Sequence, residues 1–259
     1  MNNIYISAAQ KSSGKTILSI GLAKIFAEKK IPVRTFKKGP DFIDPSWLKF
    51  ASSKNSYNLD FNTQGKLEIK NFYNQKKLKF NIIEGNKGLY DGVDIKGSDS
   101  NAEMAKLLDA PVILILNCEG ITRGIAPLIQ GYINFDKKCN ISGVILNNVA
   151  SSRHESKLVK SINHYTNLDT LGSIRKTKDL ISERHLGLIP SFENKTSQDI
   201  VQKISHLISE SVDTQKILKK FSTPEKEPSI KFSKKNKRKK VFLKNTKRKL
   251  NLGIIKDNA

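Results

Sequence analysis

Three short stretches of the sequence carry residues that could bind phosphate and a metal ion. The first, AAQKSSGKT at residues 8–16, approaches the phosphate-loop pattern G-x-x-x-x-G-K-[ST], but Ala9 stands where the leading glycine is usual. In that pattern backbone N–H groups hold phosphate oxygens, the lysine reaches the β- and γ-phosphates, and the last hydroxyl binds Mg²⁺. A chance Ser-Gly turn with a solvated lysine is the competing interpretation. We predict ATP contacts from Ser12, Ser13, Gly14, Lys15 and Thr16.

The second stretch, FKKGPDFIDP at residues 36–45, places two carboxylates around a proline-bounded turn. Asp41 and Asp44 are three positions apart, close enough to hold one cation together. Asp44 precedes a proline, so we expect it to be extended. A polar loop with ordinary turn-forming residues is the alternative.

The third stretch, IIEGNKGLYDG at residues 82–92, combines acidic residues with glycines. Glu84 ends an apolar run, where phosphate-loop enzymes carry an acidic ligand for Mg²⁺ or water. Asp91 follows seven residues later in the same loop. One such loop could be a glycine-rich connection with incidental charges, but three acidic or phosphate-binding loops after successive strands favour a shared site.

The elements around these loops alternate between strand and helix patterns. Short β-branched runs predict strands at residues 3–9, 32–37, 79–85, 110–117, 141–148 and 169–174, and helical periodicity follows at 15–30, 121–135, 152–165 and 197–212. This alternation predicts an α/β fold of the phosphate-loop NTPase type, a mostly parallel sheet with helices on both faces. The carboxyl ends of its strands are where such sheets bind ligands.

Positive charge is unevenly distributed along the chain. The formal net charge is +22, and between Lys216 and Leu250 fifteen lysines and arginines face two glutamates. We predict a catalytic domain at residues 1–215, a flexible basic linker at 216–249 and, at 250–259, the first strand of a further domain. The basic segment could bind nucleic acid, but it lacks aromatic interleaving, so a solvated linker is preferred. Two cysteines and no apolar run of membrane-spanning length predict a cytoplasmic protein that does not enter the membrane.

The motifs together resemble the cobyrinic acid a,c-diamide synthase family. The resemblance rests on SSGKT, FKKGPDFIDPSWL, NLDFNT, EGNKGLYDG, NAEMAKLLDAPVILIL, GVILNNVASSRHE and ERHLGLIP, in that order, and reaches about Pro190. It implies a dethiobiotin-synthetase-like domain followed by a class I glutamine amidotransferase domain. It also implies ATP- and Mg²⁺-dependent amidation of the a- and c-acetate carboxylates of cobyrinic acid or a sirohaem-like tetrapyrrole, through an acyl phosphate.

The resemblance also implies roles for individual residues. It assigns catalysis to Lys15, Asp41, Asp44 and Glu84. It assigns Mg²⁺ binding to Thr16, Asp44 and Glu84. Asn147 reads adenine, and the substrate is contacted by Lys37, Tyr90 and Asp91. Four further basic residues could receive the substrate's carboxylates, namely Arg123, Arg153, His154 and His185. A plain surface role explains these four residues equally well.

The sequence departs from the family in ways that leave alternatives open. Ile17 replaces a common second threonine, and the glutaminase nucleophile has no counterpart, because Cys118 and Cys139 lie inside the synthetase region. Ammonia would then be free or come from a separate glutaminase subunit, and the family suggests a homodimer. The alternatives are a dethiobiotin-synthetase-class enzyme, an inactive gene fragment, or a partition- or MinD-like regulatory ATPase, whose usual first-loop lysine is replaced here by Gln10.

Overall fold

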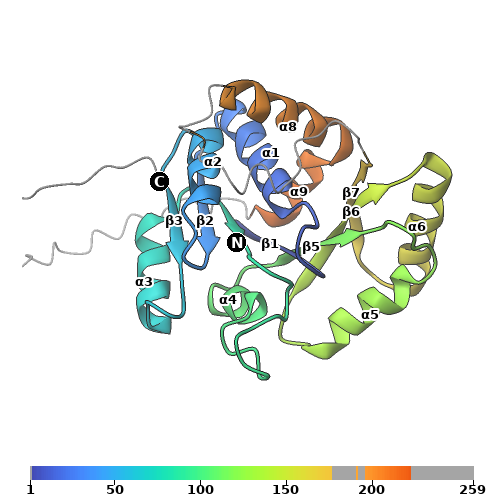
Figure 1. Ribbon diagram of the computed structural model, residues 1–259, viewed down its shortest axis with the longest axis horizontal. Helices are drawn as coiled ribbons and strands as arrows, with labels where there is room; N and C mark the ends of the chain where they lie inside the picture. Colours follow the sequence, from blue (N-terminus) through green and yellow to red (C-terminus); the bar gives the residue numbers. More distant parts are fainter. Residues whose placement is uncertain (1, 177–190, 192–195, 223–259) are drawn as a thin grey trace, which may run out of the picture. The chain divides into compact units, whose positions relative to one another are not determined.

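A computed structural model of the chain describes residues 2–176, 191 and 196–222. In this part of the chain the strands form one parallel sheet in the order β3-β2-β4-β1-β5-β6-β7 (Figure 1). The strands are β1 (Asn3–Ala8), β2 (Val33–Lys38), β3 (Ser56–Leu59), β4 (Phe80–Glu84), β5 (Val112–Asn117), β6 (Ile141–Val149) and β7 (Asp169–Arg175). β1, β4 and β5 are buried along nearly their whole length, as expected for central strands covered on both faces.

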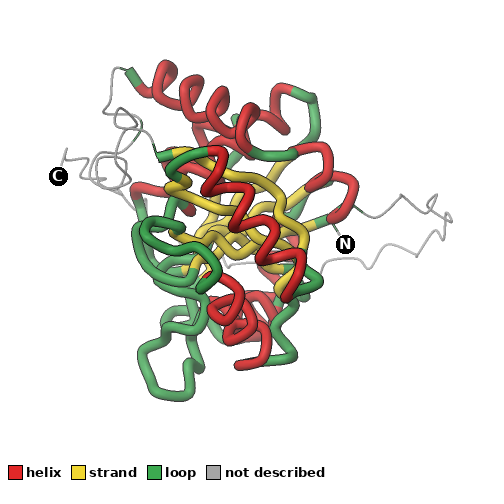
Figure 2. Tube along the Cα trace, turned by 90° about the vertical axis from the view of Figure 1, so that its right-hand side faces the viewer, coloured by secondary structure: helices red, strands yellow, loops and turns green. Residues whose placement is uncertain are grey.

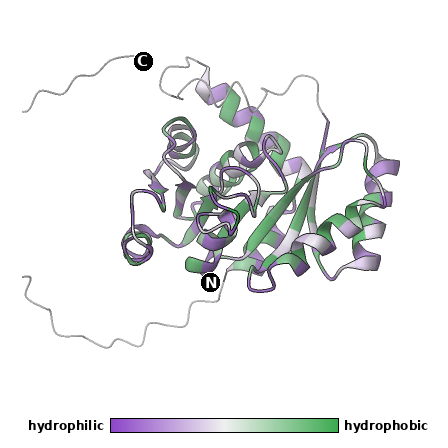
Figure 3. Ribbon diagram, turned by 60° about the horizontal axis from the view of Figure 1, so that its bottom comes forward, coloured by the Kyte–Doolittle hydropathy of each residue, from purple (hydrophilic) through white to green (hydrophobic). Residues whose placement is uncertain are grey.

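Helices cover the two faces of the sheet and bury one hydrophobic cluster on each (Figure 2). One cluster includes residues of α1 (Lys15–Glu28), α2 (Ile43–Ser52), α8 (Ser197–Ser211) and α9 (Thr214–Phe221). The other includes residues of α3 (Lys66–Lys76), α4 (Asn101–Leu107), α5 (Ile125–Phe135) and α6 (Ser152–Tyr165). The central strands are hydrophobic along most of their length in Figure 3, so the sheet itself forms the middle of the core.

The α/β prediction is confirmed, and the structure adds elements that periodicity did not predict. These are the edge strand β3 and the helices α2, α3, α4 and α9. The expectation that Asp44 is extended is wrong, because Asp44 lies in the first turn of α2. Pro45 is tolerated there because the first N–H groups of a helix have no intrahelical partner, so its missing N–H costs nothing.

The end of the described part also differs from the predicted boundary at residue 215. α9 continues to Phe221, and Ile217 and Phe221 are buried, so the start of the predicted basic linker is helical and packed. The rest of that linker and the predicted strand at 250–259 lie outside the described residues. Within the described residues, no helix is both long and apolar enough to cross a bilayer.

Candidate functional site

The three stretches singled out in the sequence lie after three neighbouring strands. β2, β4 and β1 are adjacent in the sheet, and all are parallel, so their carboxyl ends share one edge. The phosphate-loop stretch follows β1, the aspartate stretch follows β2, and the glutamate stretch ends β4. The order of the strands therefore brings Thr16 and Glu84 into contact, although they are 68 positions apart in the sequence.

The phosphate-loop stretch keeps its loop form without its first glycine. Positive φ angles occur at Ser12 (53°) and Gly14 (96°), and Ala9 is not among the residues with positive φ. A non-glycine residue at the first position is therefore unstrained. α1 begins directly after Gly14, so the N–H groups of its first turn and its positive dipole end point into this loop, as phosphate binding needs.

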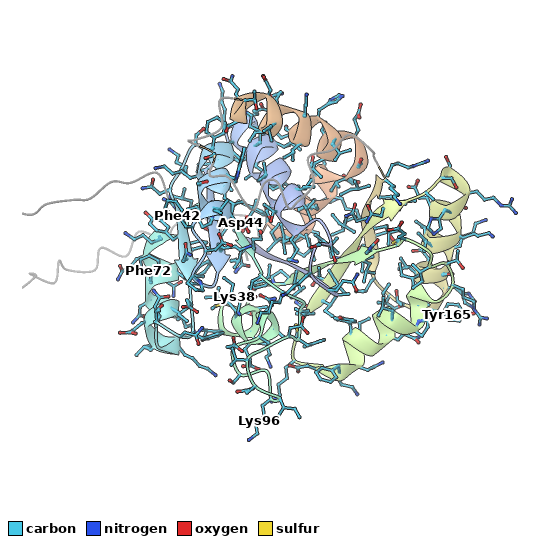
Figure 4. The ribbon with its side chains drawn as sticks, viewed as in Figure 1. Lys38, Phe42, Asp44, Phe72, Lys96 and Tyr165 are labelled. Carbon is cyan, nitrogen blue, oxygen red and sulfur yellow. The ribbon has the colours of Figure 1, made fainter. Side chains whose placement is uncertain are left out.

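A buried ionic cluster joins the three strand ends. Lys37 Nζ lies 2.5 Å from Asp44 Oδ2 and 2.7 Å from Glu84 Oε1. Thr16 donates its hydroxyl to the same Glu84 Oε1 at 2.7 Å. Glu84 is fully buried, and Lys37 and Asp44 are nearly so. Figure 4 labels Asp44 near the centre of the view, close to the ends of the strands.

Two carboxylates share one ammonium in this cluster, because Asp44 and Glu84 both contact Lys37. Burial disfavours the Lys37 ammonium, but Glu84 and Asp44 outweigh it and raise the pKa of Lys37 above its ordinary value. Burial, with Asp44 adding to it, raises the pKa of Glu84 despite the attraction of Lys37. A cation with more than one charge would therefore be accommodated here.

The donor set fits Mg²⁺. Glu84 Oε2 is buried and has no hydrogen-bond partner, so one carboxylate oxygen is available to a further ligand. Among the described residues, no three His, Cys, Asp or Glu side chains form a metal-binding group of their own. Mg²⁺ does not require one, because it is usually held by one or two carboxylates together with water and phosphate oxygens. Thr16 and Glu84, which are in contact, and Asp44, which shares Lys37 with Glu84, supply such a set.

Asp41 lies at the margin of this cluster. Its Oδ2 is 4.0 Å from Lys37 Nζ, and its Oδ1 accepts a hydrogen bond from the Asp44 N–H at 3.0 Å. Burial and the neighbouring Asp44 raise its pKa. The geometry thus has Asp41 holding the start of α2, with Asp44 carried inward by the same turn.

Asn147 lies against the phosphate-loop stretch from the other side. Its Nδ2 donates to the Ser13 carbonyl at 2.9 Å, and a Cβ added to Gly14 would approach that nitrogen to 2.7 Å. Only glycine fits at position 14, both for space and for its φ. The predicted nucleotide residues from Ser12 to Thr16 and Asn147 are therefore neighbours.

The predicted substrate residues are spread more widely. Lys37 lies inside the carboxylate cluster rather than facing outward. Tyr90 donates its hydroxyl to the Tyr132 carbonyl at 2.6 Å and stacks on that ring, so it packs against α5. Asp91 Oδ2 accepts from the Gly88 N–H at 2.9 Å and is exposed. Their substrate roles remain predictions.

The four basic residues do not gather at the cluster. Arg123 donates to the hydroxyl of Tyr165, which Figure 4 shows on α6 at the right of the view. Both ring nitrogens of His154 are bonded to the backbone, Nδ1 to the Ala150 N–H and Nε2 to the Ile121 carbonyl. Arg153 is exposed. His185 lies outside the described residues.

Two buried residues near the site had no signal in the sequence. Asn101 accepts from the Asn86 N–H and donates to the Gly88 carbonyl, which holds the glycine-rich loop. Lys38 is buried at the end of β2, with its Nζ 3.4 Å from Asn86 Oδ1, and burial lowers its pKa. These hydrogen bonds fix the start of the glycine-rich loop after β4, and Lys96 lies at the far tip of that loop (Figure 4).

Comparison with known proteins agrees with this geometry. Residues 5–189 match the model of the CobQ/CobB/MinD/ParA nucleotide binding domain. The chain is 38% identical over 218 residues to a cobyrinate a,c-diamide synthase of Magnetococcus marinus, covering 83% of this chain and 47% of that protein. It is 38% identical over 243 residues to the protein of that name from Picrophilus torridus, covering 91% and 54%. The chain thus spans about half the length of these curated relatives.

Among solved structures, the MinD cell division protein of Aquifex aeolicus shares the fold. The two superpose with a TM-score of 0.50 over 82% of this chain and 99% of that one, at 15% sequence identity. At this identity the likeness concerns the fold alone.

Proposed function

Because the chain belongs to the CobQ/CobB/MinD/ParA nucleotide-binding family, we propose that its site binds ATP and activates a carboxylate of a tetrapyrrole acid for amidation. The observation that carries the proposal is the buried cluster in which Thr16, Lys37 and Glu84 meet directly behind the phosphate-loop stretch. The names of the relatives, cobyrinate a,c-diamide synthases at 36–38% identity, supply the substrate class.

The reaction needs activation because hydroxide is a poor leaving group. An oxygen of the substrate carboxylate attacks the γ-phosphorus of ATP, the bond from that phosphorus to the β-phosphate oxygen breaks, and ADP leaves. Ammonia then attacks the carbon of the acyl phosphate, phosphate departs with the C–O bond electrons, and the nitrogen loses a proton. The product is a carboxamide, with ADP and inorganic phosphate.

The chain's own residues manage the charge in this reaction. The backbone N–H groups between Ser12 and Thr16 and the Lys15 ammonium hold the phosphates, offsetting the repulsion between ATP and a carboxylate. Lys37 keeps Asp44 and Glu84 from repelling one another. A Mg²⁺ held by Thr16, Asp44 and Glu84 would supply further charge neutralisation at the β- and γ-phosphates.

The finer parts of the proposal rest on the family resemblance. They are reaction at the a- and c-acetate groups, contacts from Asp91 to the substrate, adenine recognition by Asn147, ammonia from solution or a separate glutaminase subunit, and assembly as a homodimer. The short distance between Asn147 and the Ser13 carbonyl supports a place for the nucleotide next to this side chain.

The experiment is incubation of the full chain with ATP, Mg²⁺, ammonium and cobyrinic acid or a sirohydrochlorin-type acid. Mass spectrometry should detect exchange of a carboxylate OH for NH₂ that requires ATP. Lys15→Ala should abolish the exchange, whereas Lys24→Ala, a partly exposed lysine of the same helix that pairs with Glu28, should retain it. Glutamine replaces ammonium as a test of the ammonia source.

Two outcomes would contradict the proposal. Equal product from Lys15→Ala and the unaltered chain would remove the phosphate loop from the reaction. ATP hydrolysis that responds to DNA or lipid vesicles, with no product from any tetrapyrrole acid, would instead favour a regulatory ATPase.

A further inference from the structure

The phosphate-loop stretch is held from outside by a tyrosine of α5. Tyr132 donates its hydroxyl to the carbonyl of Ala9 at 2.7 Å, across 123 positions of sequence. Ala9 is the residue that replaces the first glycine of the pattern. We infer that Tyr132 is a positioning residue for nucleotide binding, fixing the first peptide of the phosphate loop through the Ala9 carbonyl.

The backbone around Ala9 shows how this anchor acts. The Ala9 N–H donates to the Ile115 carbonyl at 3.2 Å, and the Ala8 carbonyl accepts from the Leu89 N–H at 2.8 Å. These bonds tie the residue to the sheet and to the glycine-rich loop. The next group, the Ala9 carbonyl, is the last point fixed from outside before the chain turns into the loop, and Tyr132 holds it.

Carbonyl anchors of this kind orient the N–H groups that phosphate needs. In a trans peptide the C=O and the following N–H point in opposite directions, and no cis peptide occurs in the described part of the chain. Tyr132 holds the Ala9 carbonyl, Ser13 Oγ holds the Gln10 carbonyl, and Asn147 holds the Ser13 carbonyl. Each bond directs the following N–H away from its anchor and so limits the loop to one arrangement.

Tyr132 itself is held in place on several sides. Its ring stacks on Tyr90 at 5.5 Å between centroids, and its own carbonyl accepts the Tyr90 hydroxyl at 2.6 Å. Burial, and then the charge of Asp91, raises the pKa of its hydroxyl, so that hydroxyl remains a donor in the physiological range. A tyrosine with a fixed ring offers a directional donor at a small entropy cost.

This inference rests on the proposed nucleotide site, and the test separates the two. The full chain, Tyr132→Phe and Tyr73→Phe are titrated with Mg-ADP and a non-hydrolysable Mg-ATP analogue. Tyr73 is the control, because its hydroxyl also takes part in a hydrogen bond, accepting from Asn3 Nδ2 at 3.2 Å, away from the loop. Tyr132→Phe keeps the ring and removes only the bond to Ala9.

Because Tyr132→Phe loses one hydrogen bond, its affinity for both nucleotides should be about three- to tenfold lower than that of the unaltered chain. Tyr73→Phe should bind them as the unaltered chain does. Adenosine, which has no phosphate, should compete equally well for the variant and the unaltered chain, a result that general loosening of the fold would not give. Tyr132→Leu, which also removes the stacked ring, should weaken nucleotide binding at least as much.

The outcomes are distinguishable. If the unaltered chain binds neither nucleotide, the proposed function fails. If it binds both and Tyr132→Phe binds them equally tightly, the role of Tyr132 is refuted while the nucleotide site stands. A parallel loss of adenosine competition would make the effect structural and would also overturn the inference.

Discussion

At the scale of single residues, the site depends on one buried lysine that faces two carboxylates. The sequence suggested that Lys37 meets the substrate, but its ammonium lies between Asp44 and Glu84. A buried ion pair contributes less to stability than its short distances suggest, because desolvation opposes it. Removing one partner is nevertheless costly, since the remaining charges stay buried without compensation.

Lys37→Met should therefore lower the free energy of unfolding by about 3–5 kcal/mol, measured by urea denaturation. Adding Glu84→Gln to this variant removes one of the two stranded carboxylates and should restore part of the loss. If the double variant is less stable than Lys37→Met by the full cost of Glu84→Gln alone, the two residues are not coupled and this description of the cluster is wrong.

The residues of the site were predictable to different degrees. Thr16, Asp44 and Glu84 could be predicted to converge because the carboxyl ends of parallel strands meet at one edge. The inward direction of Lys37 could not, because Lys37 and Lys38 adjoin in sequence and nothing in their types tells which one meets the carboxylates. Tyr132 gave no signal either, since its partner is a backbone carbonyl 123 positions away.

At the scale of elements, the glycine-rich loop after β4 packs closely against the phosphate-loop stretch. A Cβ added to Gly88 would lie 2.7 Å from the Ala9 carbonyl oxygen and 2.6 Å from Asp91 Oδ2. The carbonyl belongs to the backbone and is tied to Tyr132, so it cannot move aside cheaply. The two loops therefore constrain one another.

Gly88→Ala should destabilise the fold by about 1–3 kcal/mol and weaken nucleotide binding, as urea denaturation and nucleotide titration would detect. Gly131→Ala is the matched control. Gly131 lies in α5 with nothing within 4 Å of an added Cβ, so alanine should stabilise that helix by up to about 1 kcal/mol. Unchanged stability and affinity in Gly88→Ala would contradict the close packing of the loops.

The docking of α9 on β7 has an electrostatic part. Asp169 of β7 accepts from Lys216 at 2.7 Å and also from Lys220, and these hydrogen bonds lower the pKa of its carboxyl. A lowered pKa in the folded state adds stability above the ordinary carboxyl pKa, and this stability is lost as the pH falls through the lowered value.

Asp169→Asn should therefore cost at most about 1 kcal/mol near neutral pH, because the pair is partly exposed and screened by solvent. The difference between the variant and the unaltered chain should vanish as the pH falls below the ordinary carboxyl range. Urea denaturation at several pH values measures this. A difference that grows on acidification has the wrong sign and would exclude the mechanism.

The elements themselves followed from periodicity where apolar residues are regularly spaced. The central strands and α1 were predicted because burial on both sides demands nearly continuous apolar residues. β3, with four residues of which only Leu59 is buried, and α3, which buries only Ile69 and Tyr73, gave too weak a pattern. α2 was missed because Pro45 was interpreted as a turn residue rather than as part of a first helical turn.

At the scale of the whole molecule, the family and the fold are the ones that the sequence predicted. The resemblance to cobyrinic acid a,c-diamide synthases is confirmed by relatives of that name and by a family match over residues 5–189, close to the predicted extent. Among the described residues, the elements that supply the site lie within residues 2–176. α8 lies later in the chain and packs on α1 in the same hydrophobic cluster, so the described support of the site extends to residue 211.

The most direct test of this account is a crystal structure of the chain with Mg²⁺ and a non-hydrolysable ATP analogue. The triphosphate should lie along the N–H groups between Ser12 and Thr16, with the ion near Thr16, Asp44 and Glu84. Ligand oxygens bound directly to the ion should lie at about 2.1 Å. A triphosphate bound elsewhere, or an ion that contacts none of these three side chains, would contradict it.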